Sequence, residues 1–174
     1  MISGGRVRLR PRRLSDAVRN YTWRTDPELC RLNASSPLTI NFILYLAEYA
    51  CELGRAWQKR KQFAIDTLEG EHIGNCAYHS INNEGGEAEF GIIIGNRSYW
   101  GAGYGADAIN TLIDHIFRDT KLERIFLKVL DFNKRAQGCF AKCGFTVCGE
   151  LINDGHNFVL MELYRYRWQQ IRSK

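Results

Sequence analysis

The sequence contains little that would place it in a membrane, outside the cell or around a metal ion. Its six cysteines include no Cys-x-x-Cys pair, so neither a zinc site nor a disulfide framework is indicated. No basic start is followed by the apolar segment of a signal peptide, and no apolar run approaches the roughly 18 residues of a membrane span. We therefore expect a cytoplasmic protein with reduced thiols that works without a membrane.

The four histidines do not supply a metal site either. His72 and His79 are separated by an odd number of residues, so they would point to opposite sides of one strand. Internal repeats and low-complexity segments are also absent from the sequence. We therefore expect no metal cofactor.

The charge of the chain is modest. A formal net charge of +5 favours anionic ligands, but it is too small and too scattered to indicate a nucleic-acid-binding protein. The 174 residues are 45% hydrophobic and 25% charged, which is ordinary for a globular protein. The composition therefore predicts one domain that spans residues 1–174 and buries a sizeable core.

The stretch of residues 87–117 carries the strongest local signal. Its first part is an apolar and β-branched run that ends at Ile94, and Gly95 and Asn96 follow, as expected for a mostly buried strand. In residues 109–117 the apolar side chains follow the spacing of one face of a helix. The period therefore changes from strand to helix within this stretch.

Three glycines alternate in the turn between this strand and this helix, at Gly101, Gly103 and Gly105. Glycine lets the backbone approach a ligand closely, and the first amide groups of the helix lack partners inside it. The spacing fits neither a P-loop nor a dinucleotide fingerprint. It still predicts a turn that binds an anion, most often phosphate.

Periodicity in the rest of the chain predicts an α/β (α+β) fold. We expect a central mixed, mostly antiparallel sheet of seven strands with about four helices. The strands are expected at residues 6–10, 62–68, 72–81, 87–94, 124–130, 145–151 and 157–166. The helices are expected near residues 14–21, 39–57, 109–117 and 133–143.

Two motifs resemble the GCN5-related N-acetyltransferase (GNAT) superfamily. Its acetyl-coenzyme A motif is usually Gln/Arg-x-x-Gly-x-Gly/Ala, and Gly103 and Gly105 match the glycines, while Trp100 stands where Gln or Arg is usual. Residues 133–145 are similar to the family signature Asn-x-x-Ala-x-x-x-Tyr-x-Lys-x-Gly-Phe. The form Trp-Gly-x-Gly-Tyr-Gly/Ala looks like the branch of ribosomal-protein alanine and spermidine acetyltransferases. The resemblance covers nearly the whole chain and implies a single GNAT-like domain.

The resemblance implies acetyl-coenzyme A as co-substrate. In the family the pantetheine arm pairs with the free backbone of the strand before the turn, the turn amides bind the pyrophosphate, and an asparagine at the next helix contacts the pantetheine region. The residues expected to bind the cofactor are Ile92, Ile93, Ile94, Arg97, Trp100, Gly101, Ala102, Gly103, Tyr104, Gly105, Ala106, Asn133 and Lys142.

Several of these residues also have a purely structural interpretation. The isoleucines suit a buried strand, and their side chains and backbone can serve different tasks. Arg97 could equally be a solvated surface arginine. Asn133 has the side chain of a helix N-cap, and Lys142 suits an exposed helix position.

The catalytic groups are less clearly indicated. Alignment on the glycines puts Glu89 where histone acetyltransferases of the superfamily have their general-base glutamate, and its alternative is a strand glutamate paired with an arginine. Lys128 stands where ribosomal alanine acetyltransferases have a glutamate. Phe140 replaces the tyrosine proposed as general acid in many relatives, which leaves Cys139 and Tyr104 as candidate proton donors.

The resemblance implies transfer of an acetyl group from acetyl-coenzyme A to a primary amine: a protein N-terminus, a polyamine, an aminoglycoside or another small amine. The alternative is a non-catalytic acyl-coenzyme A binding module that acts as a sensor or partner subunit. We expect a small-molecule or protein amine as partner, and a homodimer is a further expectation. A polycationic acceptor would need an acidic pocket, for which the candidates are Glu28, Glu48, Glu52, Glu84 and Glu87.

Overall fold

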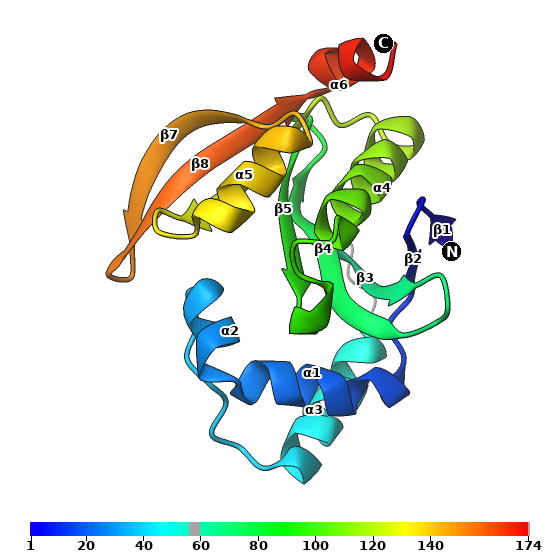
Figure 1. The fold of residues 1–174 in the computed structure, drawn as a ribbon, viewed down its shortest axis with the longest axis vertical. Helices are drawn as coiled ribbons and strands as arrows, with labels where there is room; N and C mark the ends of the chain where they lie inside the picture. The colour runs from blue at the N-terminus through cyan, green and yellow to red at the C-terminus, as the bar shows by residue number, and fades with distance from the viewer. Residues whose placement is uncertain (56–59, 174) are drawn as a thin grey trace.

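A computed structural model describes residues 1–55 and 60–173, which contain one eight-stranded sheet (Figure 1). The strand order is β1-β2-β3-β4-β5-β6-β8-β7, and β5 and β6 are parallel while the other neighbours are antiparallel. The strands are β1 (Ile2–Ser3), β2 (Val7–Arg10), β3 (Arg60–Thr67), β4 (His72–Asn82), β5 (Glu87–Ile94), β6 (Arg124–Leu130), β7 (Thr146–Asn153) and β8 (His156–Tyr164). The mixed, mostly antiparallel sheet is confirmed. The predicted count of seven strands missed β1, which has only two residues.

Six α-helices and two short 3₁₀ helices occur in the described residues. They are η1 (Leu14–Asp16), α1 (Ala17–Thr25), α2 (Pro27–Leu32), α3 (Phe42–Leu53), η2 (Arg97–Tyr99), α4 (Tyr104–Asp119), α5 (Lys134–Lys142) and α6 (Arg165–Arg172). The four expected helices correspond to α1, α3, α4 and α5. The expected extension of the second helix to Trp57 lies outside the described residues.

Helix α2 was not among the four helices that the sequence predicted. The Asp26 side chain accepts hydrogen bonds from the backbone N–H groups of Glu28 and Leu29, both at 3.0 Å, and Pro27 occupies the first helical position. Both features are standard helix starts. The Asp-Pro pair therefore starts a helix, and the segment was too short for its periodicity to show this.

Helix α6 also replaces part of an expected strand. Strand β8 ends at Tyr164 instead of residue 166, because Arg165 turns away to meet the C-terminal end of α4. Its guanidinium donates to the backbone carbonyl oxygens of Phe117 and Thr120, which have no partner inside the helix at that end, and to that of Leu122 just beyond it. This contact joins segments more than 40 residues apart.

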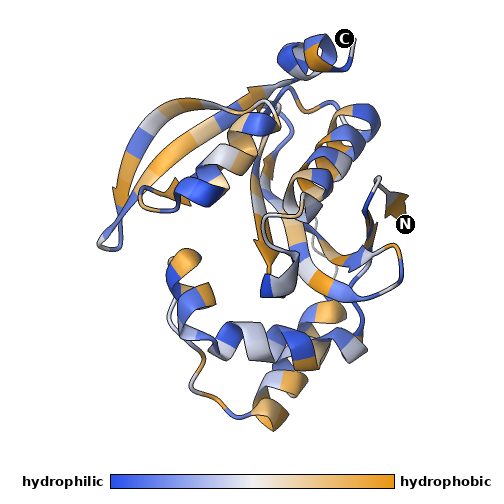
Figure 2. Ribbon diagram, in the orientation of Figure 1, coloured by the Kyte–Doolittle hydropathy of each residue, from blue (hydrophilic) through white to orange (hydrophobic). Residues whose placement is uncertain are grey.

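The core lies between one face of the sheet and helices α4 and α5. The helical face predicted for residues 109–117 is confirmed. Each of its five apolar side chains is at most 2% exposed: Ile109, Leu112, Ile113, Ile116 and Phe117. They pack against alternate strand residues such as Phe90 and Ile125, and Figure 2 shows hydrophobic residues along the strands that support them.

Helices α1, α2 and α3 lie together on the other side of the sheet (Figure 1). In β4, Cys76 and Tyr78 belong to the core beneath α4, so the alternating Asn75 faces the opposite way. Its side chain donates a hydrogen bond to Asn20 of α1 at 2.5 Å. One face of β4 therefore packs in the core beneath α4, and the other face contacts α1.

A buried cluster of charges attaches this helical layer to the sheet. Arg10 of β2 donates to Asp66 of β3 at 2.6 Å and to both carboxylate oxygens of Asp16 at 2.8 Å. Burial alone would raise the pKa of Asp16, but the hydrogen bonds from Arg10 and from the Arg13 backbone hold that pKa below its ordinary 3.8. All three charged side chains are buried.

Replacing Arg10 by alanine should strongly destabilise the protein. The change leaves Asp16 and Asp66 buried without their cation, and breaking a buried ion pair typically costs about 3–5 kcal/mol. Urea denaturation of Arg10→Ala measures the loss. The control is Arg8→Ala, an exposed position on the same strand, which should stay within about 0.5 kcal/mol of wild type. Equal stability of the two variants would contradict the role of the cluster.

Candidate active site

Strand β5 separates from β6 after its first three residues. It pairs with β4 up to Ile94, but with β6 only from Glu87 to Glu89. Strand β6 meanwhile stays paired with β8 as far as Leu130. The rest of β5 therefore has one backbone edge that the sheet does not use.

The backbone groups of Ile92 and Ile94 lie on this open edge. A side chain added at Gly74 of β4 would collide with the carbonyl oxygen of Ile93, so the backbone of Ile93 faces β4. Its neighbours along the strand then face the other way. The carbonyl oxygen of Ile94 accepts a hydrogen bond from the Trp100 indole at 2.7 Å. The edge at Ile92 remains for a ligand.

The glycine turn after β5 has the geometry that the sequence predicted. Gly101 and Gly103 have φ values of 76° and 87°, in the left-handed region that favours glycine. Gly103 is the N-cap of α4, so the first amide groups of that helix face out of it beside the turn. The side chain of Arg6 lies against the same turn, 3.6 Å from the position of a Cβ at Gly103.

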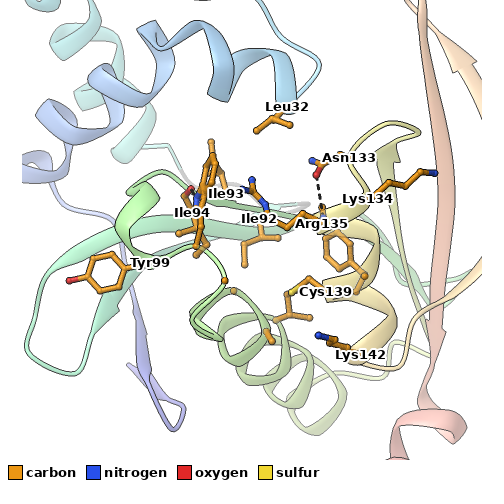
Figure 3. Close-up of a pocket in the computed structure, with 18 of the residues that line it drawn as sticks. Leu32, Ile92, Ile93, Ile94, Tyr99, Asn133, Lys134, Arg135, Cys139 and Lys142 are labelled. Carbon is orange, nitrogen blue, oxygen red and sulfur yellow. Dashed lines mark hydrogen bonds between the residues drawn. The ribbon is translucent and has the colours of Figure 1, made fainter.

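A first cavity of about 520 Å³ lies between the end of β5, the glycine turn, α2 and α5 (Figure 3). Of the expected cofactor residues, its wall contains Ile92, Ile93, Ile94, Trp100, Gly101, Gly103, Gly105, Ala106, Asn133 and Lys142. Figure 3 shows the three isoleucines of β5 on one side and Asn133, Cys139 and Lys142 on the other. The two motifs therefore meet across one cavity.

Three expected residues lie outside this wall. Ala102 is exposed at the tip of the turn, and the ring of Tyr104 packs edge-on against Tyr99 at a centroid distance of 4.8 Å. Arg97 forms ion pairs with Asp26 at 2.7 Å and Glu28 at 2.9 Å, so it attaches α2 to the loop after β5. A phosphate contact by Arg97 stays a prediction.

Arg135 is a wall residue that sequence reasoning missed. Its guanidinium lies 3.5 Å from the ring centre of Trp100, within the range of a cation–π interaction. The family usually has Gln or Arg at position 100, and here a guanidinium comes to the same position from α5. The second motif could have indicated Arg135, because this arginine lies in the first turn of α5, two residues after the predicted cofactor residue Asn133.

Asn133 fits both interpretations of its side chain. Its Oδ1 atom accepts a hydrogen bond from the Ala136 N–H at 3.2 Å, so it caps α5 (Figure 3). The same residue lines the first cavity. A cap of this kind fixes the side chain and leaves its amide nitrogen for a ligand.

Phe140 is packed as a core residue. Its ring is 6% exposed and makes edge contacts with Phe90 and Phe145 at centroid distances of 6.2 and 5.7 Å. Of the two candidate proton donors, Cys139 lines the first cavity and Tyr104 does not. A hydrogen bond from the Cys143 thiol lowers the pKa of Cys139 to about 7.

A second cavity of about 520 Å³ lies between helices α1 and α3 and the face of the sheet opposite α4. Asn33, Ile92 and Ile93 line both cavities. The floor of the second cavity includes Gly91, where an added Cβ would meet no described atom within 4 Å. The two cavities therefore meet at β5.

Glu89 lies next to the second cavity, and His79 lines it. The two residues are direct partners across the β4–β5 pair. The His79 Nδ1 atom is 4.0 Å from Glu89 Oε2, and the other carboxylate oxygen is 3.1 Å from Lys128 Nζ. Burial lowers the pKa of His79 below 6.5, although Glu89 opposes this shift. The expected pairing of Glu89 with an arginine is therefore replaced by a lysine.

Comparison with known proteins decides the family. A family model described as an acetyltransferase (GNAT) domain matches residues 6–146. This chain belongs to the GNAT acetyltransferase family. It is an N-acetyltransferase whose co-substrate is acetyl-coenzyme A, as the two motifs predicted.

Curated relatives of this acetyltransferase match it in part. An uncharacterized N-acetyltransferase named p20 from Bacillus licheniformis is 31% identical over 125 residues, which cover 71% of this chain and 70% of that protein. The spermidine N(1)-acetyltransferase of Escherichia coli (strain K12) is 32% identical over 108 residues, which cover 62% of this chain and 55% of the relative.

Solved structures share the fold over nearly the whole acetyltransferase chain. A spermidine N-acetyltransferase from Vibrio cholerae in complex with coenzyme A and spermine has a TM-score of 0.82 and 21% identity, and the match covers 94% of this chain and 98% of that one. An aminoglycoside acetyltransferase in complex with coenzyme A has a TM-score of 0.79 and 20% identity, with 95% and 99% covered. The single-domain α+β fold is confirmed.

Coenzyme A affinity should depend on the glycine turn of this acetyltransferase. Gly103→Glu adds bulk and a negative charge where turn amides would meet the pyrophosphate, so calorimetry should show at least about tenfold weaker binding. Gly155→Glu is the matched control, since Gly155 also has a positive φ of 74° and open space around it. Equal affinity of the two folded variants would remove the turn from the cofactor site.

Proposed function

We propose that this acetyltransferase moves an acetyl group from acetyl-coenzyme A in the first cavity to a primary amine in the second cavity. The observation that carries the proposal is the wall shared by Asn33, Ile92 and Ile93. A thioester along the open edge of β5 would meet an amine that enters from the opposite side. Holding two reactants at such a junction removes much of the entropic cost of their encounter.

The reaction is aminolysis of a thioester. The amine nitrogen attacks the carbonyl carbon, an N–C bond forms, the C–S bond breaks, and coenzyme A leaves as a thiolate while the nitrogen loses a proton. The backbone N–H of Ile92, on the open edge, would donate to the oxygen that becomes negatively charged during attack. In β5, the side chains would then pack while the backbone binds the thioester.

The amine must lose its proton, because a lysine-like amine has a pKa of about 10 and is mostly protonated at neutral pH. Glu89, the predicted base, lies next to the second cavity, whereas His79 belongs to its wall, so we assign the task to His79 with Glu89 as its partner. The ring of His79 lines the second cavity, and burial lowers its pKa, which favours the neutral form that can accept a proton. His79 lies several residues along the sheet from Ile92 and Ile93, so it would accept the proton through a chain of water molecules in the cavity, and the carboxylate of Glu89 would stabilise the resulting imidazolium.

Phe140 cannot protonate the leaving group. A thiol of pKa about 8.5 is a tolerable leaving group as the thiolate, so the reaction does not require a strong acid. Cys139 lines the first cavity with a pKa lowered to about 7, and it is our candidate for returning a proton to coenzyme A.

Release of free thiol tests the proposed function. Purified protein with acetyl-coenzyme A should release thiol when amines are added, and mass spectrometry should find the acetylated amine. The panel should include a peptide with a free N-terminus, spermidine and an aminoglycoside. Coenzyme A binding without turnover on every amine would instead support the alternative function, a non-catalytic sensor or partner module.

Turnover should depend on both His79 and Glu89. His79→Gln and Glu89→Gln should each lower the turnover number by about 10² at neutral pH, while coenzyme A affinity stays unchanged. Turnover of the wild type should fall as pH drops through the lowered pKa of His79, because the imidazolium cannot accept a proton.

The pH profile separates a positioning role of Glu89 from a merely structural one. Glu89 raises the pKa of His79, so Glu89→Gln should move the acidic limb of turnover to lower pH. Lys128→Gln removes the ion partner of Glu89 and a cation that lowers the pKa of His79, so it should move the limb the other way. An unchanged profile in both variants would remove the pair from the mechanism.

We also propose that the protein works in the cytoplasm. All six cysteines are free thiols, as a reducing compartment would keep them. None of the described helices is long and apolar enough to cross a bilayer, and the described residues contain no cluster of ligands suited to a metal ion.

A homodimer stays a prediction, which sedimentation would test.

A further inference from the structure

The five glutamates considered for an acidic acceptor pocket do not converge. Glu28 pairs with Arg97 at 2.9 Å and Glu87 pairs with Arg124 at 2.7 Å, and neither lines the second cavity. Glu84 lies in the exposed turn between β4 and β5. Only Glu48 and Glu52 belong to the wall of the second cavity.

One of these two carboxylates already has a cation. Glu52 of α3 forms an ion pair with Arg12 at 3.1 Å and accepts a hydrogen bond from Gln62 at 3.3 Å. The guanidinium of Arg12 also lies over the ring of Tyr49, 4.9 Å from its centre, so the pair is fixed in place. Glu48 alone is left to attract a positive charge.

The cations of the second cavity are in excess. Its wall contains three arginines, Arg12, Arg24 and Arg60, against two glutamates. Within the described parts of the chain, neither Arg24 nor Arg60 forms an ion pair. Two guanidiniums are therefore available to a ligand, and they disfavour a polycation.

The register of the sheet shows where Arg60 stands relative to the reaction. Arg60 is the direct partner of His79 across β3 and β4, and His79 is the partner of Glu89 across β4 and β5. These side chains share the face that lines the cavity. Ile93 lies four residues along β5 from that row, roughly 13 Å at the usual strand rise. An acceptor that extends along β5 can thus reach from the junction at Ile92 and Ile93 to Arg60.

We infer that the acceptor is a primary amine that also carries a carboxylate, held so that the carboxylate meets Arg60 while the amine lies at Ile92 and Ile93, and that Arg24 adds to the positive potential of the same wall. This inference deepens the proposed function and rests on it. It separates this chain from the relatives named for spermidine, spermine or aminoglycosides, whose named acceptors are polycations. A short acidic peptide with a free N-terminus and a small amino acid with a distant carboxylate share the required chemistry.

Matched acceptors test the inference without any variant. The peptide arm compares Ala-Ala-Asp amide with its Asn isostere and its Lys analogue, and the small-molecule arm compares δ-aminovalerate with its amide. The ratio of kcat/KM between the carboxylate and amide member of a pair should be roughly five to ten. It should shrink as salt screens the charges. Whichever arm shows the larger ratio identifies the source of the carboxylate.

Two variants then locate the effect. Arg24→Gln and Arg60→Gln should bring the Asp to Asn ratio toward one, whereas Arg167→Gln, an exposed position on α6, should leave it as in wild type. Ratios near one in the wild type, or faster acetylation of spermidine or the Lys peptide, would overturn the inference and leave the proposed function intact. Thiol release with none of these acceptors and with no aminoglycoside would overturn both.

Discussion

The active site depends on the separation of β5 from β6. A strand edge with unpaired N–H and C=O groups is costly unless something satisfies them, and here pairing with β6 stops after Glu89. The protein satisfies part of the exposed edge itself, since the indole of Trp100 donates to the carbonyl oxygen of Ile94. The remaining edge at Ile92 provides the backbone groups that an extended pantetheine arm needs, so the break in the sheet creates the site.

The departures from the family motifs become intelligible as packing. Trp100 gives up the side-chain charge that is usual at its position, but its indole caps a strand carbonyl and its face supports the guanidinium of Arg135. A flat aromatic ring can do both at once. Phe140, in contrast, is enclosed by other aromatic rings, so the structure uses this position for the core beneath the cavity.

Sequence patterns predicted the parts of the molecule that local periodicity determines. The strand from Glu87 to Ile94, the glycine turn and the buried face of α4 all follow from the spacing of residues close in the chain. The missing parts depend on partners far apart. Arg97 meets Asp26, which is 71 residues away, and α6 begins where Arg165 finds carbonyl oxygens 43 to 48 residues away. No local pattern could have revealed either contact.

The period of two in β5 then explains how one strand serves core, cofactor and acceptor. Phe90 points into the core beneath α5, whereas Glu89, Gly91 and Ile93 alternate onto the opposite face. On that face Gly91 leaves open space where a side chain would fill the second cavity. Because side chains use the two faces and the backbone uses the edge, these three tasks do not compete for the same atoms. The geometry of a strand therefore lets the thioester and the amine meet at a residue whose own side chain stays packed.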